Sequence, residues 1–123
     1  MSVSWKDVVA LTKTLPGVVE GTSYGTPALR VAKTFMTRLR TEDDSIVIKL
    51  PIDERDMRIE AAPEIYFITD HYKAWPAVLV RLAKVSKSEL KAVLERAWRD
   101  AAPKKLLQAF DGAPPAPAKR RAK

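Results

Sequence analysis

The residues that could perform acid–base or metal chemistry are few: one histidine, two short acidic clusters and no cysteine in 123 residues. His71 directly follows Asp70, and adjacent residues on an extended chain point to opposite sides, so these two side chains are not expected to work as a base and its orienting partner. A zinc site needs several histidine or cysteine ligands, which this composition does not supply. We therefore expect no enzyme activity, no bound metal and no cofactor, and we expect His71 to face solvent or to shape its loop.

Both acidic clusters have structural explanations. The cluster Glu42-Asp43-Asp44 lies at an expected hairpin turn, where aspartate side chains hydrogen-bond the backbone. The second cluster, Asp53-Glu54 with Asp56, lies at the start of an expected helix, where acidic residues complement the helix dipole. Neither cluster is expected to hold a metal or to form a catalytic pair.

A glycine-rich segment runs from Gly17 to Pro27 and includes Gly21 and Gly25. A phosphate-binding loop requires a lysine and a serine or threonine directly after its last glycine, at the start of a helix. Here Thr26-Pro27 leads into an expected strand instead. We expect this segment to be a long loop over the sheet, with a ligand site lined by Tyr24 as the alternative.

Basic residues alternate with apolar residues along the expected strands. Along Phe35–Arg40, for example, the alternation places Phe35 and Leu39 toward the core and Arg38 and Arg40 on the opposite face. The same reasoning places five basic residues and no acidic residue on one helix-free face: Arg30, Arg38, Arg40, Lys49 and Arg81. Such a face could bind nucleic acid or another anionic partner, or could simply be solvated.

Trp75 and the C-terminal residues add two further candidates. Trp75 lies in the polar and aromatic stretch 70–76, where it could stack on a base or pack over the sheet edge. Residues 111–123 have the proline-, alanine- and lysine/arginine-rich composition of a disordered tail. Within it Lys119, Arg120 and Arg121 would raise affinity for polyanions, although the tail could equally serve solubility alone.

These candidates must be positioned by an α+β domain that we expect to span residues 1–110. The pattern predicts an antiparallel sheet of about five strands with helices packed on one face. The predicted strands are Leu29–Val31, Phe35–Arg40, Ile46–Leu50, Ile65–Ile68 and Ala77–Leu82. The predicted helices are a first one from Ser4 to Leu15, a short one over Asp53–Ala62, a long one that begins with a Ser86/Glu89 capping box and includes Leu90–Trp98, and a last one over Lys104–Phe110.

Composition places this domain in a broad class. Apolar residues at 46% and charged residues at 30% are typical of a globular chain. The absence of cysteine is compatible with a reducing compartment, and neither a signal peptide nor a membrane span is expected. The formal net charge of +7 favours anionic partners. We therefore expect a monomeric cytoplasmic protein that does not associate with membranes.

Several dispersed segments resemble the MmcQ/YjbR-like family. Leu15-Pro16-Gly17 and the segment Gly21–Val31 are similar to its opening signature, and two later segments agree in order: Trp75 ahead of Val78–Leu82, and Leu90–Trp98 followed by Ala102-Pro103. The resemblance covers roughly Trp5 to Phe110. It implies a compact fold similar to CyaY/frataxin, described as a double-wing arrangement, and a DNA-binding role that rests on fold analogy.

The sequence departs from that family at two places. The turn Ala32-Lys33 lacks the glycine that the family often has there, which makes this wing tip less predictable. The frataxin likeness would imply iron on an acidic first helix, but this helix carries only Asp7, beside Lys6 and Lys13. We therefore do not expect iron binding.

Together these observations predict a non-enzymatic binding module. Its expected ligand is nucleic acid, DNA in particular, bound through the basic sheet face and the basic tail. Two alternatives remain at this point. One is a protein–protein adaptor that uses the same face, and the other is a small-molecule binder near Tyr24, His71 and Trp75.

Overall fold

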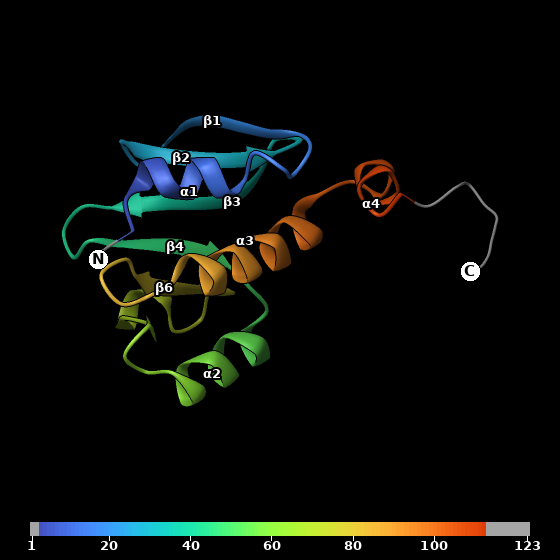
Figure 1. The fold of residues 1–123 in the computed structure, drawn as a ribbon. Coiled ribbons are helices and arrows are strands. Elements are labelled where there is room, and N and C mark those ends of the chain that lie inside the picture. The colour runs from blue at the N-terminus through green and yellow to red at the C-terminus, as the bar shows by residue number, and fades with distance from the viewer. Residues whose placement is uncertain (1–2, 113–123) are drawn as a thin grey trace.

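A six-stranded, fully antiparallel sheet forms the centre of the computed structural model, which describes residues 3–112 (Figure 1). The strand order across the sheet is β1-β2-β3-β4-β6-β5. The strands are β1 (Val18–Ser23), β2 (Thr26–Val31), β3 (Thr34–Arg40), β4 (Ser45–Lys49), β5 (Tyr66–Phe67) and β6 (Ala77–Arg81). The α+β class with an antiparallel sheet is thus as predicted.

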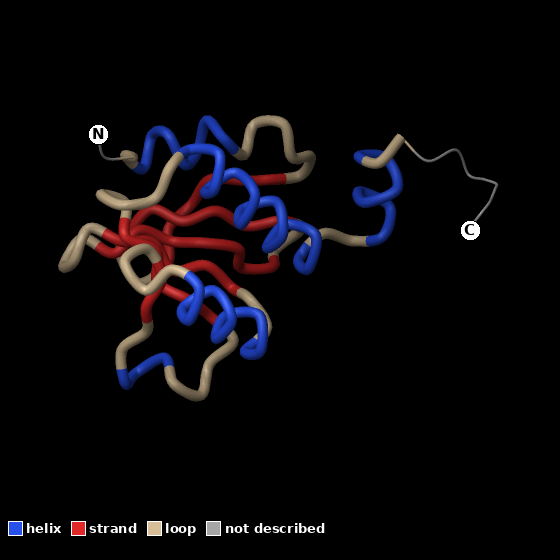
Figure 2. The backbone as a smooth tube through the Cα atoms, turned by 60° about the horizontal axis from the view of Figure 1, so that its bottom comes forward, coloured by secondary structure: helices blue, strands red, loops and turns tan. Residues whose placement is uncertain are grey.

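Two helices, α1 (Trp5–Leu11) and α3 (Lys87–Ala101), lie over the same face of the sheet (Figures 1 and 2). The short helix α2 (Ile52–Ala61) flanks the β6–β5 end, and a single 3-10 turn, η1 (Asp70–Tyr72), precedes β6. The last helix, α4 (Lys104–Phe110), continues beyond α3 and returns Phe110 to the Trp98 ring, with 4.8 Å between the ring centroids. The opposite face of the sheet therefore has no helix among residues 3–112 lying across it.

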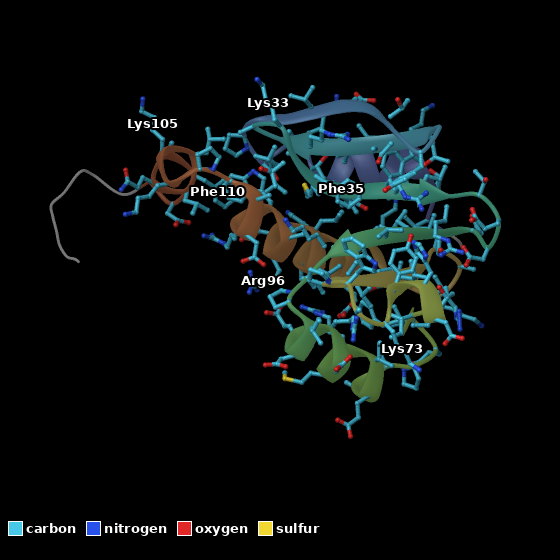
Figure 3. All side chains as sticks on the ribbon, turned by 180° about the vertical axis from the view of Figure 1, so that it is seen from behind. Lys33, Phe35, Lys73, Arg96, Lys105 and Phe110 are labelled. Carbon is cyan, nitrogen blue, oxygen red and sulfur yellow. The ribbon has the colours of Figure 1, made fainter. Side chains whose placement is uncertain are left out.

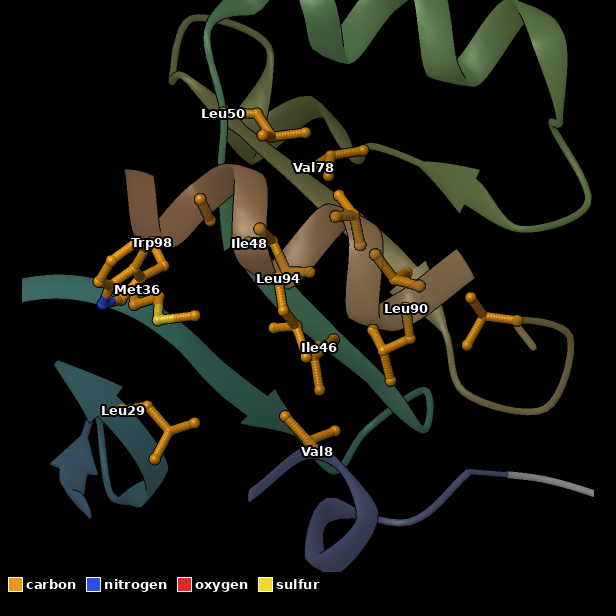
Figure 4. Close-up of a cluster of buried hydrophobic side chains, with 14 of the residues drawn as sticks. Val8, Leu29, Met36, Ile46, Ile48, Leu50, Val78, Leu90, Leu94 and Trp98 are labelled. Atoms are coloured by element: carbon orange, nitrogen blue, oxygen red, sulfur yellow. The ribbon is translucent and has the colours of Figure 1, made fainter. Parts of the chain in front are cut away.

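The main core fills the layer between the sheet and α1 and α3 (Figure 4). The apolar stripe of α3 is fully used there, because Leu90, Val93, Leu94, Ala97 and Trp98 are all buried. The indole Nε1 of Trp98 donates a 2.9 Å hydrogen bond to the Pro16 carbonyl, so the one polar atom of this ring is satisfied inside the core.

The glycine-rich segment is a strand and not the predicted loop. Strand β1 pairs with β2 from Val18↔Val31 to Ser23↔Thr26, and only Tyr24 and Gly25 form the turn between them. The strand signal was weak in the sequence because β1 is an edge strand whose central residues are all exposed, so no alternation of apolar and polar residues is imposed on it. The sheet consequently has six strands where about five were expected.

A β-bulge changes the phase of β3. Leu29 pairs with Thr37 but Arg30 pairs with Phe35, so Met36 is an extra residue on β3. Met36 is fully buried in the main core (Figure 4). Phe35 lies on the helix-free face, with Val47, Ala77 and Leu79. The prediction that placed Phe35 in the core was therefore wrong, because strict alternation does not anticipate a bulge. Beyond the bulge the predicted phase holds, and Arg38 and Arg40 lie on the helix-free face.

The helix starts also differ in detail from expectation. Ser86 caps α3 by accepting from the Glu89 backbone N–H at 3.1 Å, but the Glu89 carboxylate does not close a capping box. It accepts from the Tyr66 hydroxyl and from Arg58 Nη1, which ties the first turn of α3 to β5 and α2. Burial, reinforced by this hydrogen bond, raises the pKa of Tyr66 to about 12. The complete capping box occurs at α1, between Ser4 and Asp7, and that helix ends at Leu11 and not at Leu15.

An ion pair ties the residue after α4 to α3. Asp111 forms an ion pair with Arg99, whose Nη2 is 2.8 Å from the Asp111 carboxylate. The predicted disorder of the remaining tail, including Lys119, Arg120 and Arg121, falls outside the described residues. Within residues 3–112 none of the helices combines the length and the apolar character that crossing a bilayer would demand.

Candidate functional site

The five basic residues predicted for one face do lie on one face. In antiparallel pairing, directly opposite residues share a face of the sheet. Arg38 is opposite Ala28 and Val47, Arg30 is opposite Phe35, and Lys49 is opposite Ala77. Ser45 pairs with both Arg40 and Arg81. Figure 3 shows the molecule from this side, which we call the open face.

The open face is hollowed. A concave space of about 1170 Å³ lies over β2, β3 and β4, between the β1–β2 turn and the loop that precedes β6. Its lining combines cationic and aromatic side chains: Arg30, Arg38, Arg40 and Lys49 with Tyr24, Phe35, His71, Tyr72 and Trp75. Of the five predicted basic residues, Arg81 does not line this space. Its guanidinium lies over the Phe67 ring, 4.0 Å from the centroid.

Arg38 is held in the middle of this space by contacts with both of its walls. Its Nη1 donates to Thr26 Oγ1 at 3.4 Å, and its Nη2 donates to the Tyr72 hydroxyl at 3.1 Å. The guanidinium also lies 5.2 Å from the centroid of the Tyr24 ring. Because none of these partners is an anion, the positive charge of Arg38 is oriented without being neutralised by these contacts.

Arg40 differs, because its charge is already compensated. Its Nη2 lies 3.2 Å from the Asp43 carboxylate and 3.6 Å from Glu42, and the side chain is only 12% exposed. The expectation that no acid shares the basic face was therefore wrong at this position. The tight β3–β4 turn brings its acidic residues back beside Arg40, a neighbourhood that strand alternation alone does not show. Its Nε has no protein hydrogen-bond partner among the described residues.

Arg55, on α2, is the residue of this region that the sequence did not single out. Its side chain is buried, and its Nη1 donates to the carbonyl oxygens of Tyr72, Lys73 and Trp75 at 3.0, 3.3 and 2.8 Å. Its Nε pairs with Asp56 at 2.9 Å. Arg55 is thus a positioning residue for the loop that forms one wall of the hollow. The only signal in the sequence is an arginine within the acidic cluster Asp53-Glu54 and Asp56.

Two aromatic side chains on the walls are strongly exposed. Tyr24 is 90% exposed at the β1–β2 turn, and Trp75 is 60% exposed in the loop held by Arg55. Most of the Trp75 side chain is therefore open to solvent. His71 is exposed, as expected, and meets Tyr72 edge-on with 5.0 Å between the ring centroids.

The arginines on the helical side are compensated locally. Arg96 Nη2 lies 2.9 Å from Glu54 Oε1, and Arg96 Nη1 lies 2.6 Å from Asp100 Oδ1. Arg99 contacts Glu95 at 3.2 Å, in addition to its bond with Asp111. Over residues 3–112, no three His, Asp or Glu side chains are grouped closely enough to hold a metal ion. Among the arginines of residues 3–112, the uncompensated charge is therefore concentrated on the open face.

Comparisons with known proteins agree with this fold. The chain is 39% identical over 72 residues to uncharacterised proteins of Mycobacterium tuberculosis and Mycobacterium bovis, an alignment that covers 58% of this chain and 50% of each relative. The chain thus spans about half the length of the curated relatives it matches. A crystal structure of a Deinococcus radiodurans protein with a DUF419 domain superposes with a TM-score of 0.69 at 15% identity, covering 88% of both chains. The family model named YjbR matches residues 13–100, and the chain therefore belongs to the YjbR family.

Proposed function

We propose that this domain is a non-enzymatic module that binds nucleic acid through its open face. The observation that carries the proposal is the convergence of Arg30, Arg38 and Lys49 on one concave surface without a carboxylate partner among the contacts described for them. Cationic side chains spread over neighbouring strands can meet successive phosphates of one backbone. Each neutralised phosphate releases condensed counterions, which supplies affinity that does not depend on sequence.

The arrangement favours phosphate contact over base reading. The arginines Arg58, Arg96 and Arg99 of helices α2 and α3 are paired with carboxylates and are not free to read bases in a groove; their partners are Glu89, Glu54, Asp100, Glu95 and Asp111. Phosphate contacts position a protein on nucleic acid but carry no sequence information. We therefore propose binding with little sequence specificity.

The apolar residues on the open face are buried, which weakens the case for a protein–protein adaptor. Val47 is 3% exposed and Leu79 is fully buried, since Phe35, Phe67 and Tyr72 pack over them. Met36, which would have added to an adhesive surface, lies in the main core. A protein partner would therefore meet charged and aromatic groups there, with little aliphatic surface.

We further propose that the protein acts as a monomer in the cytoplasm, where nucleic acid is the abundant polyanion. The absence of cysteine fits a reducing compartment. The tail cations Lys119, Arg120 and Arg121 would raise affinity by long-range attraction, whereas the open face would provide the contact surface.

The proposal is tested by separating the open face from the tail in the full-length chain. We expect a variant with Lys119, Arg120, Arg121 and Lys123 changed to glutamine to retain binding of a labelled oligonucleotide in fluorescence anisotropy. With three phosphates neutralised by the face, log affinity should fall against log salt with a slope of about −2 to −3. Absence of binding by this variant at 50 mM salt would show that the folded domain is not the nucleic-acid module. An oligonucleotide affinity that does not change with salt would show that the open face does not bind through phosphates and would contradict the proposed mode of contact.

A further inference from the structure

The large apolar side chains that the structure leaves exposed include two aromatics, and both are on the walls of the hollow. The exposed set among the described residues is Val19, Tyr24, Ile52, Met57 and Trp75. Tyr24 comes from the β1–β2 turn and Trp75 from the loop before β6, segments about fifty residues apart in the sequence, yet both line the same concave space. Exposed aromatic rings beside unpaired cations favour nucleic acid as the ligand. Its bases can stack on the rings, and the phosphates between the bases can pair with the cations.

Tyr24 occupies a position that disfavours tyrosine. Its φ is +54° and that of Gly25 is +77°, so both turn residues have the left-handed backbone of a two-residue hairpin. Glycine or asparagine is usual at such a position, and a bulky residue there is strained. The side chain is also 90% exposed, so core packing does not offset this strain. The Tyr24 ring does contact Arg38, whose guanidinium carbon lies 5.2 Å from the ring centroid.

Trp75 is exposed on an ordered loop. Its backbone N–H donates to the Tyr72 carbonyl at 3.1 Å, and its carbonyl accepts from Arg55 at 2.8 Å. The backbone that carries this ring is therefore fixed before any ligand arrives, which lowers the entropy cost of binding.

We infer that the open face binds single-stranded nucleic acid, with unpaired bases stacked on Tyr24 and Trp75 and the intervening phosphates on Arg38 and Arg30. This inference rests on the proposed function and narrows its ligand. In a duplex the faces of the bases are stacked on one another, so the two rings would have no partner. In a single strand each base offers a free face, and stacking on it does not depend on sequence.

The test compares ligands and variants of the 123-residue chain. Anisotropy is measured with a labelled 15-nucleotide oligo(dT), with oligo(rU) of the same length and with a hairpin duplex. We expect both single strands to bind more tightly than the duplex. Tyr24→Gly and Trp75→Ala should each weaken single-strand binding about fivefold or more, while Tyr24→Phe should retain it. In addition, the single strand should quench the fluorescence of Trp75, a signal that is lost in Trp75→Phe.

Glycine relieves backbone strain at residue 24, so Tyr24→Gly should not lower the melting temperature. Two further variants, Ala32→Gly and Met57→Ala, control for effects that do not involve stacking. Ala32→Gly relieves the same strain at the second hairpin turn, where φ is +48°, and should leave binding unchanged. Met57→Ala removes a 65% exposed side chain on α2 and should also leave binding unchanged.

The outcomes separate this inference from the proposed function. Duplex binding that equals or exceeds single-strand binding, or full single-strand affinity in Tyr24→Gly and Trp75→Ala, would overturn the stacking inference and leave the basic face as a nucleic-acid surface. A lack of binding to all three ligands would overturn both.

Discussion

Replacing Arg55 by alanine is expected to lower the free energy of unfolding by about 2–4 kcal/mol, because hydrogen bonds to a charged group each contribute about 1.5–3 kcal/mol and three carbonyl oxygens share this one donor. The side chain is only 5% exposed, so its loss also leaves a gap between α2 and the loop that carries Trp75. For a domain of this size such a change corresponds to a fall of roughly 10 °C in melting temperature. Thermal unfolding followed by circular dichroism measures it.

The control for Arg55 is another ion-paired arginine. Arg96→Ala breaks contacts with Glu54 and Asp100 but leaves a 35% exposed site, so we expect a loss of at most about 1 kcal/mol. Arg55→Lys retains the charge on a shorter side chain and should fall between alanine and the wild type. If the Arg55→Ala variant has the same melting temperature as the wild type, Arg55 does not hold this loop in place.

The second large effect is expected in binding. Replacing Arg38 and Arg40 by alanine should flatten the slope of log affinity against log salt by about 0.7–0.9, the contribution of the one phosphate contact that is lost with Arg38. We expect affinity to fall about tenfold, with most of the loss due to Arg38, because Glu42 and Asp43 already compensate Arg40. Anisotropy titrations between 50 and 200 mM salt measure both quantities.

Matched charge changes elsewhere make this result specific. Lys13→Ala with Lys91→Ala removes two exposed cations from α3 and from the turn after α1, and it should change the slope by less than the double arginine variant. Conversely, Glu42→Gln frees Arg40 from one of its acidic neighbours and should raise affinity. If both double variants lose affinity equally, only net charge matters and the open face has no special role.

Much of the fold could be predicted because its main signals are local. The apolar stripe Leu90–Trp98 fixes α3, and period-two alternation places Arg30, Lys49 and Arg81 correctly. Three features required tertiary information. Strand β1 has no buried face that would impose an alternation of apolar and polar residues. The bulge at Met36 inserts one residue into the regular pattern of β3. Glu89 accepts a hydrogen bond from the Tyr66 hydroxyl and does not cap its own helix.

The candidate site divides in the same way. Its cations could be predicted from alternation, since a strand side chain has only two faces to choose between. The wall residues Tyr24 and Trp75 could be singled out as candidates, but their positions could not be predicted, because they belong to connections whose conformation depends on a strained turn and on a distant arginine, Arg55. The compensation of Arg40 by Asp43 likewise depends on how the β3–β4 turn folds back on the sheet.

The central claim, that the open face is the contact surface, is tested most directly by mapping backbone amide shifts of the ¹⁵N-labelled full-length protein during titration with oligo(dT). We expect the largest shifts at Tyr24–Arg30, at Arg38 and in the loop Tyr72–Trp75, and small shifts along α1 and α3. Shifts confined to the helical face, or the absence of shifts throughout β2, β3 and the loop at saturating oligonucleotide, would contradict the claim.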